Sequence, residues 1–234
     1  MREEPRPRFI SDANAPFEIG GVRSIDMLSL EERKAALAAH LCEEDRERLA
    51  AFDEALAPLE SDLQKSHEIA RLHMREQLGG KSNPHAADSV FVLRPAIHTR
   101  FQHTQLQAEL TKAAAAHLGL PIDTAKIMVA AAWLHDCAHC AFSHIGDEIL
   151  VQNGRPDHEG RALEVVRGPL RETLEQYGVD ATVEDVMGER GTLGVMQSIL
   201  DTFSYLMLDL ESVKIELTDD GGASLINSFV RLDD

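Results

Sequence analysis

The residues best suited to chemistry lie in one short stretch of the chain. It begins with an apolar run from Val129 to Leu134. Imidazole and carboxylate groups follow at His135, Asp136, His139, His144, Asp147 and Glu148. An apolar run belongs in a core, and a histidine and a carboxylate at its end are costly to bury without a partner. The simplest shared partner for neighbouring imidazole and carboxylate ligands is a divalent metal ion.

His135 and Asp136 alone do not complete a metal site. Side chains of neighbouring helical residues point about 100° apart, so both reach one ion only at a helix end or against a facing helix. We expect two further ligands from His103 and from Asp201, which lies in the mostly apolar segment 197–203. Two neutral imidazoles and two carboxylates balance a 2+ ion and leave positions open for water and a substrate oxygen.

Periodicity, caps and breakers predict a mainly helical chain around these residues. Helices are expected at about 29–57, 60–78, 102–118, 122–138, 143–152, 158–176 and 194–211. Ser29 and Glu32 form a capping box, Pro58 should interrupt the chain, and Asp123 should cap a helix. Residues 177–193 are interpreted as a loop that has room for a helical turn. The alternating segments 213–217 and 225–232 flank the turn D-D-G-G.

These elements predict an all-α helical bundle with a small C-terminal β-hairpin. We expect an N-terminal extension at residues 1–60, irregular and then helical and charged. The main domain is expected at 61–212 and the hairpin at 213–234.

Composition limits the class of protein. The chain has 234 residues, of which 44% are hydrophobic, enough for one large domain with a real core. Its net charge of −17 argues against a nucleic acid or an anionic membrane as the main partner. Three cysteines without a disulfide spacing indicate a reducing compartment. With no signal peptide and no long apolar run, we expect a cytoplasmic protein without a membrane span.

The order H…HD…D resembles the HD-domain metal-dependent phosphohydrolases, and most of all the deoxynucleoside triphosphate triphosphohydrolases, which include the SAM-and-HD-domain enzyme. The resemblance covers about residues 69–232. The matching segments are A-R-L-H-M-R-E-Q-L-G (70–79), H-T-R-F-Q-H-T (98–104), H-D-C-A-H-C-A-F-S-H-I-G-D (135–147), D-H-E (157–159) and D-T-F-S-Y-L-M-L-D (201–209). It implies an HD-domain helical bundle and metal-dependent hydrolysis of a dNTP to deoxynucleoside and triphosphate.

The resemblance also implies a cofactor, partners and roles for the matching residues. It implies a homo-oligomer with a nucleotide substrate and one divalent metal, Mn, Fe or Zn, with Mg or Co as substitutes. The metal ligands would be His103, His135, Asp136 and Asp201. Arg100 would touch the phosphates, and His144 would be the general acid in a group with His139, Asp147 and His158. The sugar would lie among Gln77, Leu78, Tyr205 and Asp209.

The chain departs from the family pattern in several places. Small residues other than glycine or proline stand at Ala138, Cys140 and Ala141, and Thr202 replaces a phosphate-binding lysine found in some members. Family members also continue well beyond the hairpin, so the chain is interpreted as a minimal version or a fragment.

Other readings of the same residues stay open. The chain could act on another nucleotide, such as a monophosphate, or be a catalytically weak nucleotide-binding or assembly module. His135 and His139 form the H-x-x-x-H of zinc peptidases, although the glutamate that this chemistry needs is absent. Cys137 and Cys140 form a C-x-x-C, for which core packing competes with redox or zinc chemistry.

Overall fold

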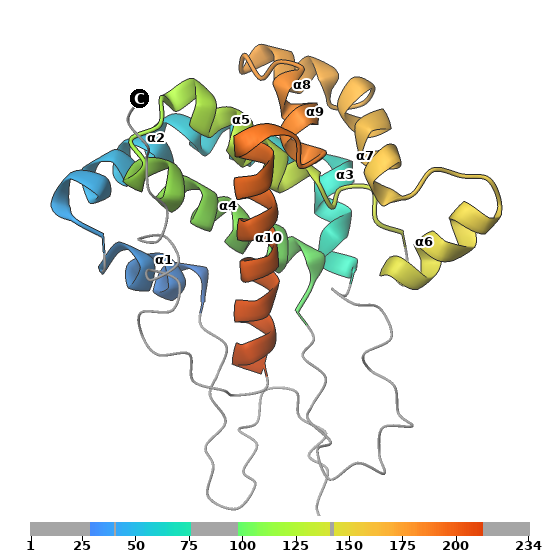
Figure 1. Ribbon diagram of the computed structural model, residues 1–234, viewed down its shortest axis with the longest axis horizontal. Coiled ribbons are helices and arrows are strands. Elements are labelled where there is room, and N and C mark those ends of the chain that lie inside the picture. The colour runs from blue at the N-terminus through green and yellow to red at the C-terminus, as the bar shows by residue number, and fades with distance from the viewer. Residues whose placement is uncertain (1–28, 40, 76–97, 141–142, 213–234) are drawn as a thin grey trace, which may run out of the picture.

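The computed structural model describes residues 29–39, 41–75, 98–140 and 143–212 (Figure 1). The regular elements in these residues are α1 (Leu30–Ala39), α2 (Glu43–Lys65), α3 (His67–Ala70), the 3₁₀ helix η1 (Arg71–Met74), α4 (Arg100–His117), α5 (Ile122–Leu134), α6 (Ser143–Gln152), α7 (His158–Arg167), α8 (Arg171–Gln176), α9 (Thr182–Met187) and α10 (Gly191–Ser212). The all-α prediction is confirmed for this part, which contains no strand. The predicted hairpin at 213–217 and 225–232 lies outside the described residues.

Helix α5 forms the centre of the core. Its residues from Met128 to Leu134 are all buried, so this part of the helix has no polar face. It packs against α2, α4, α9 and α10, and Figure 1 shows α10 crossing α4. His135 is the C-cap of α5. His135 and Asp136 therefore leave the core at a helix end, as the sequence required.

A capping box fixes the start of α4. Thr99 Oγ1 accepts a hydrogen bond from the backbone N–H of Gln102 at 3.2 Å, and Gln102 Oε1 accepts one from the N–H of Thr99 at 2.9 Å. Both exchanges satisfy donors that the first helical turn leaves free. Arg100 and His103 consequently lie in the first turn of α4 on one face. The capping box predicted at Ser29 and Glu32 is also present, because Ser29 N–H donates to Glu32 Oε2 at 2.7 Å and Glu32 N–H donates to Ser29 Oγ at 3.3 Å.

The predicted break at Pro58 is wrong. Helix α2 continues through Pro58 to Lys65, and the next helix begins after Ser66, whose hydroxyl caps α3. A proline removes one backbone hydrogen bond and strains the preceding turn. Here the buried side chains of Phe52, Leu56, Leu59 and Leu63 hold both halves of α2 against the core. Tertiary packing therefore outweighs the local preference.

Three other boundaries also differ from prediction. Pro121, rather than Asp123, occupies the N-cap of α5. The helix expected at 158–176 is divided at Gly168 into α7 and α8. The segment 177–193 contains α9, which buries Val183 and Val186 in the core. A six-residue helix is too short to leave a clear periodic pattern. Among the described helices, none is long and apolar enough to cross a membrane.

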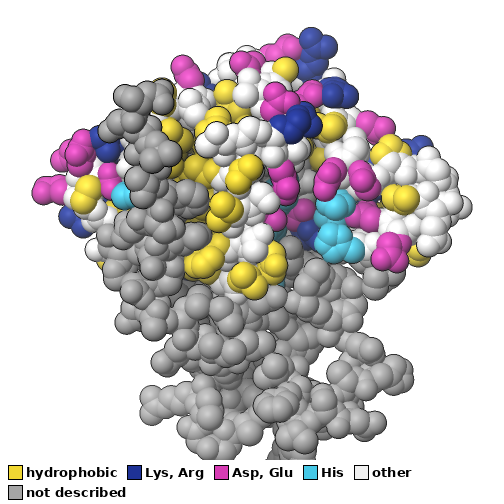
Figure 2. All heavy atoms as spheres, in the orientation of Figure 1, with side chains coloured by type: hydrophobic (Ala, Val, Ile, Leu, Met, Phe, Trp, Pro, Cys, Tyr) yellow, Lys and Arg dark blue, Asp and Glu magenta, His cyan; other side chains and the backbone are white. Residues whose placement is uncertain are grey.

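A cavity of about 530 Å³ opens beside α10, with walls from α4, the end of α5, α7 and the α9–α10 turn. Figure 2 shows histidine side chains at the surface between α10 and α7, with acidic side chains around them. Glu159 and Glu189 line the cavity, and so do Arg100 and His158. This cavity is therefore lined by the metal ligands, the arginine and the histidines that the sequence predicts for chemistry.

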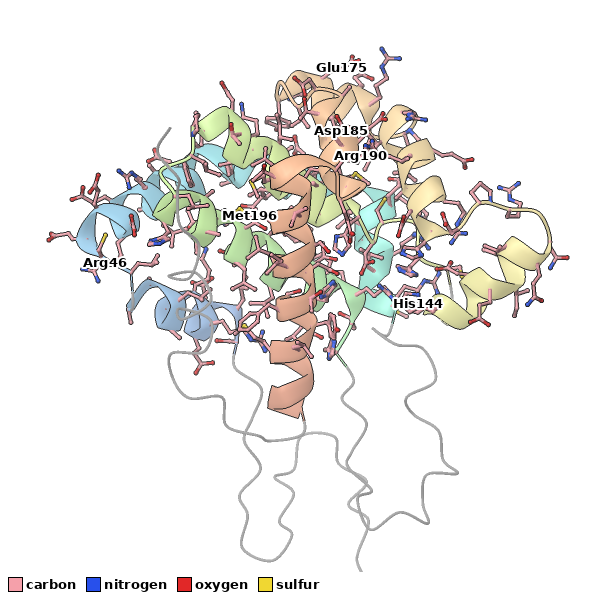
Figure 3. The ribbon with its side chains drawn as sticks, viewed as in Figure 1. Arg46, His144, Glu175, Asp185, Arg190 and Met196 are labelled. Carbon is pink, nitrogen blue, oxygen red and sulfur yellow. The ribbon has the colours of Figure 1, made fainter. Side chains whose placement is uncertain are left out.

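The turn between α9 and α10 is closely packed at Gly194. Glu189 has a φ of +56°, and Arg190 pairs with Asp185 at 2.7 Å (Figure 3). A Cβ at position 194 would lie 2.8 Å from Glu189 Cα. Alanine usually stabilises a helix relative to glycine by about 0.5–1 kcal/mol, but here it must displace backbone.

We therefore expect Gly194→Ala to destabilise the protein by about 1–3 kcal/mol, the usual effect of overpacking. Urea unfolding measures the change. Thr192→Ala, in the exposed first turn of the same helix, should change stability by less than about 0.5 kcal/mol. Equal effects of the two substitutions would contradict the close packing.

Candidate metal centre

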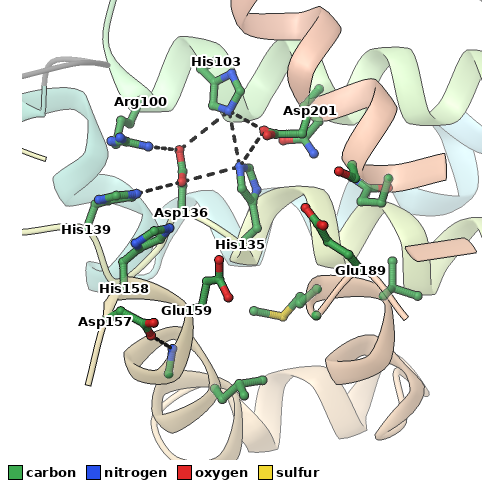
Figure 4. Close-up of a pocket in the computed structure, with 18 of the residues that line it drawn as sticks. Arg100, His103, His135, Asp136, His139, Asp157, His158, Glu159, Glu189 and Asp201 are labelled. Atoms are coloured by element: carbon green, nitrogen blue, oxygen red, sulfur yellow. Dashed lines mark hydrogen bonds and ion pairs between the residues drawn. The ribbon is translucent and has the colours of Figure 1, made fainter. Parts of the chain in front are cut away.

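Four side chains, from α4, from the residues that end α5 and from α10, meet in the cavity (Figure 4). His103 Nε2 and His135 Nε2 are 3.3 Å apart. Asp201 Oδ1 lies 2.9 Å from the first and 3.1 Å from the second. Asp136 adds Oδ2 at 3.7 Å from His103 and Oδ1 at 3.6 Å from His135. The structure thus brings together all four residues for which the sequence predicts metal binding.

Hydrogen bonds to Nδ1 determine which ring nitrogen of His103 and of His135 carries the hydrogen. His135 Nδ1 is 2.8 Å from the Ala132 carbonyl, which can only accept, so Nδ1 carries the hydrogen. The Ser204 hydroxyl donates to the Asp201 carbonyl at 2.8 Å and therefore accepts from His103 Nδ1 at 2.9 Å. When each ring is neutral, as metal binding requires, its Nε2 presents a lone pair to the cluster. Such outer hydrogen bonds are usual for metal-ligating histidines.

This donor set fits a divalent cation. The Nε2 atoms of His103 and His135 face each other, and Asp201 Oδ1 is buried without a hydrogen-bond partner. Ligands about 2.0–2.2 Å from a tetrahedral or octahedral ion are about 3–3.5 Å from one another, close to the spacing of these atoms. Two imidazoles with carboxylates suit Zn, Fe or Mn, and the geometry does not distinguish among them.

The carboxylates of the cluster also favour a positive charge beside them. Burial alone would keep His135 neutral, but the Asp136 and Asp201 carboxylates outweigh it and raise its pKa to about 9. Burial opposes ionisation of Asp136, yet His135 and Arg100 hold its pKa well below the usual range. Bound metal would supply the same positive charge without protonating a ligand.

A second polar cluster adjoins the first. His139 Nε2 lies 3.2 Å from Asp136 Oδ1, and its Nδ1 lies 3.1 Å from Asp147 Oδ2. His158 Nδ1 approaches the same Asp147 oxygen at 2.9 Å, and the rings of His139 and His158 stack with centroids 3.9 Å apart. His144, from the first turn of α6, packs edge-on against both rings. Ligand atoms of four residues in this cluster lie within 4.8 Å of one another, namely those of His139, His144, Asp147 and His158.

Arg100 joins the two clusters. It is buried, and its Nη1 donates to Asp136 Oδ2 at 2.5 Å while its Nε donates to Ser143 Oγ at 2.9 Å. Its Nη2 lies 3.4 Å from His144 Nε2 and reaches the cavity. A planar guanidinium held in this way presents a fixed donor to a phosphate oxygen.

No family model matches the chain. A deoxyguanosinetriphosphate triphosphohydrolase-like protein of Pelagibacter ubique (strain HTCC1062) is 30% identical over 142 residues, which cover 58% of this chain and 37% of that protein. The chain thus spans little more than a third of the length of this curated relative. The resemblance to the HD-domain phosphohydrolases is confirmed.

Two arginines that the sequence analysis missed support the turn after the HD dipeptide. Arg71 Nη2 donates to the carbonyls of Cys137 at 2.9 Å and His139 at 2.7 Å. Arg161 Nη2 donates to the Ala138 carbonyl at 3.1 Å and also pairs with Asp147. Arg161 follows His158 by three residues and therefore shares its helix face, a spacing that could have identified it. Arg71 carries no comparable sequence signal.

The competing motifs are not supported as sites. His135 and His139 belong to different clusters, so the H-x-x-x-H pair does not hold a common ligand position. Burial raises the pKa of the Cys137 thiol to about 12, and that of Cys140 is also raised. Neutral thiols are poor nucleophiles and metal ligands. Packing therefore describes this C-x-x-C better than redox chemistry.

The predicted sugar-binding residues are only partly visible. Tyr205 lines the cavity one helical turn beyond Asp201. Asp209 continues the same series along α10, but its side chain lies outside the described part. Gln77 and Leu78 also lie outside the described residues.

Proposed function

We propose that the chain hydrolyses deoxynucleoside triphosphates to deoxynucleoside and triphosphate with one divalent metal. One observation carries the proposal. His103, His135, Asp136 and Asp201 converge in the same cavity as the Arg100 guanidinium and three further histidines. The name of the Pelagibacter relative supports the substrate class.

In this proposal a metal ion and the chain's own side chains have separate catalytic roles. A metal held by the four donors would supply Lewis acidity toward a phosphoryl oxygen and water. Arg100 would hold a phosphoryl oxygen, since its guanidinium is already oriented by Asp136 and Ser143. His139 and His158, both in contact with Asp147, would surround the scissile phosphate.

In the proposed reaction His144 acts as the general acid. The oxygen of a water molecule bonds to the α-phosphorus, and the bond from phosphorus to the 5′ oxygen breaks. The leaving oxygen takes a proton from His144, which solvent restores. The new P–OH group releases the water's proton to solvent. Tyr205 and Asp209, with Gln77 and Leu78, would contact the sugar.

A substrate panel tests the proposal directly. We expect dNTPs incubated with the chain and Mn, Mg or Co to give deoxynucleoside and inorganic triphosphate, separated by ion-exchange chromatography. Release of orthophosphate from monophosphates alone would instead assign another nucleotide, an outcome that the exposed Thr202 allows. Binding without turnover at any metal would indicate a nucleotide-binding module.

His144→Gln should lower kcat about 10²–10⁴-fold, the usual contribution of a general acid. Burial and the neighbouring Arg100 and His158 lower the pKa of His144. Because the acid must be protonated, kcat/KM in the wild type should fall as pH rises through a pKa below about 6.5, and this limb should disappear in the variant. His117→Gln, which changes a histidine bound to Asp45, is the control. A retained limb in His144→Gln would exclude His144 as the acid.

A further inference from the structure

Helices α4 and α10 cross beside the cavity, and the contacts between them follow opposite chain directions. His103 on α4 meets Ser204 on α10 at 2.9 Å, and eight residues later Thr111 Oγ1 meets Gln197 Oε1 at 3.5 Å. Residues one helical turn apart on the two helices therefore form successive layers. Arg100 and Tyr205 lie at one end, the metal ligands lie in the middle, and Gln107 and Gln197 lie beyond them.

Gln107 and Gln197 are buried in the cavity lining without full hydrogen bonding. Gln107 is 0% exposed and Gln197 is 4% exposed. Oε1 and Nε2 of Gln107 and Nε2 of Gln197 have no hydrogen-bond partner among the described residues. A buried amide left without partners is costly, so such groups in folded proteins usually bind water or a ligand.

The two ends of the cavity differ in charge. The Arg100 end holds the guanidinium, which attracts phosphate, and the imidazoles of His139, His144 and His158, of which His144 is the proposed proton donor. The glutamine end carries neutral amides about 6 Å further along α4 and α10, one helical turn past His103 and Asp201. The metal ligands thus separate a phosphate-binding side from an amide side.

In-line displacement at phosphorus places the entering and leaving oxygens on opposite sides. Proton donors for the leaving oxygen lie at the Arg100 end, so the entering water belongs toward the amides. We propose that Gln107 and Gln197 bind and orient the attacking water, an inference that rests on the proposed hydrolysis. Gln107 Oε1 accepts a hydrogen bond from the water, and Gln197 Nε2 donates one to its oxygen. An amide does not titrate, so neither residue takes the proton.

The inference predicts a specific defect in two variants. Gln107→Leu and Gln197→Leu should each lower kcat about 10²-fold, the usual effect of misplacing a reacting group. KM and metal content, measured by inductively coupled plasma mass spectrometry, should stay unchanged. Thr104→Val is the matched control, because Thr104 Oγ1 is also buried and unpartnered on α4 but does not line the cavity.

Competition between water and methanol separates water binding from a structural role. A site whose two hydrogen bonds fit a water molecule should exclude methanol as the attacking group. Because the leucine variants lose one of these bonds, the ratio of methyl ester to hydrolysis product should rise in both. The Thr104→Val ratio should equal that of the wild type. A second readout needs no turnover: with Mn bound, exchange of ¹⁷O-labelled water measured by NMR relaxation should become faster in the leucine variants.

The outcomes distinguish the two proposals. A wild type that hydrolyses nucleotides, with leucine variants of unchanged kcat and unchanged methanol ratio, overturns the glutamine assignment alone. A folded, metal-loaded wild type that hydrolyses no nucleotide overturns the proposed function and this inference with it. Lower kcat with a raised methanol ratio supports both.

Discussion

Asp136→Asn should remove both the bound metal and the hydrolytic activity. Asp136 is buried and shares its two oxygens among Arg100, His103, His135 and His139. The amide keeps the shape of the side chain but withdraws a negative charge and offers a donor to a cation site. Loss of about 4 kcal/mol of Lewis-acid stabilisation corresponds to about a 10³-fold fall in turnover.

The effect of metal on protein stability gives an independent test of the ligand set. Wild-type stability should rise by about 2.7 kcal/mol when free metal is one hundred times its dissociation constant, because only the folded state holds the four donors together. The thermal midpoint of Asp136→Asn should not respond to metal. Asp123→Asn is the control, since Asp123 pairs with Lys126 on the surface. Stoichiometric metal in purified Asp136→Asn would contradict the proposed ligand set.

The sequence predicts this centre because chemistry restricts its residues. An apolar run ending in His135 and Asp136 needs a partner, and few other groups can neutralise a buried carboxylate beside an imidazole. The convergence of His103 and Asp201 was expected on the same grounds and is observed. The spacing from His158 places Arg161 on the same helix face, but its contacts with a backbone carbonyl and with Asp147 depend on how α7 packs.

Helix boundaries were less predictable than the centre. Pro58 has a strong local signal for a break, yet α2 passes through it because both halves bury leucines in one core. Conversely, α9 gives little local signal and forms because its own Val183 and Val186 side chains are buried in the core. Both errors arise where long-range packing decides between conformations of similar local energy.

A buried lysine should dominate the stability of the helical core. Lys112 on α4 is about 1% exposed, and its Nζ donates to Asp53 at 2.5 Å, Glu109 at 3.0 Å and Glu60 at 3.1 Å. Burial disfavours the charge, but the carboxylates outweigh it and raise the pKa of Lys112 above its usual value. Glu60 also accepts a hydrogen bond from Trp133 at 3.0 Å, which connects α2 with α5.

Lys112→Met keeps the length of the side chain but leaves Glu60 and Glu109 buried without their main cation. Breaking a buried pair in this way usually costs about 3–5 kcal/mol, a large part of the roughly 5–15 kcal/mol that stabilises a typical protein. In urea the midpoint should fall with little change in slope. Lys126→Met removes an exposed pair with Asp123 and should cost less than about 1 kcal/mol.

The pH dependence of this variant provides a second check. Burial already raises the pKa of Glu109 in the presence of Lys112, and removing the lysine should raise it further. A carboxyl whose folded pKa exceeds its unfolded value of about 4.3 binds protons more tightly in the folded state. The deficit of Lys112→Met should therefore shrink as pH falls from 7 toward the raised pKa. A deficit that is constant over this range would mean that lost packing, rather than uncompensated charge, causes the instability.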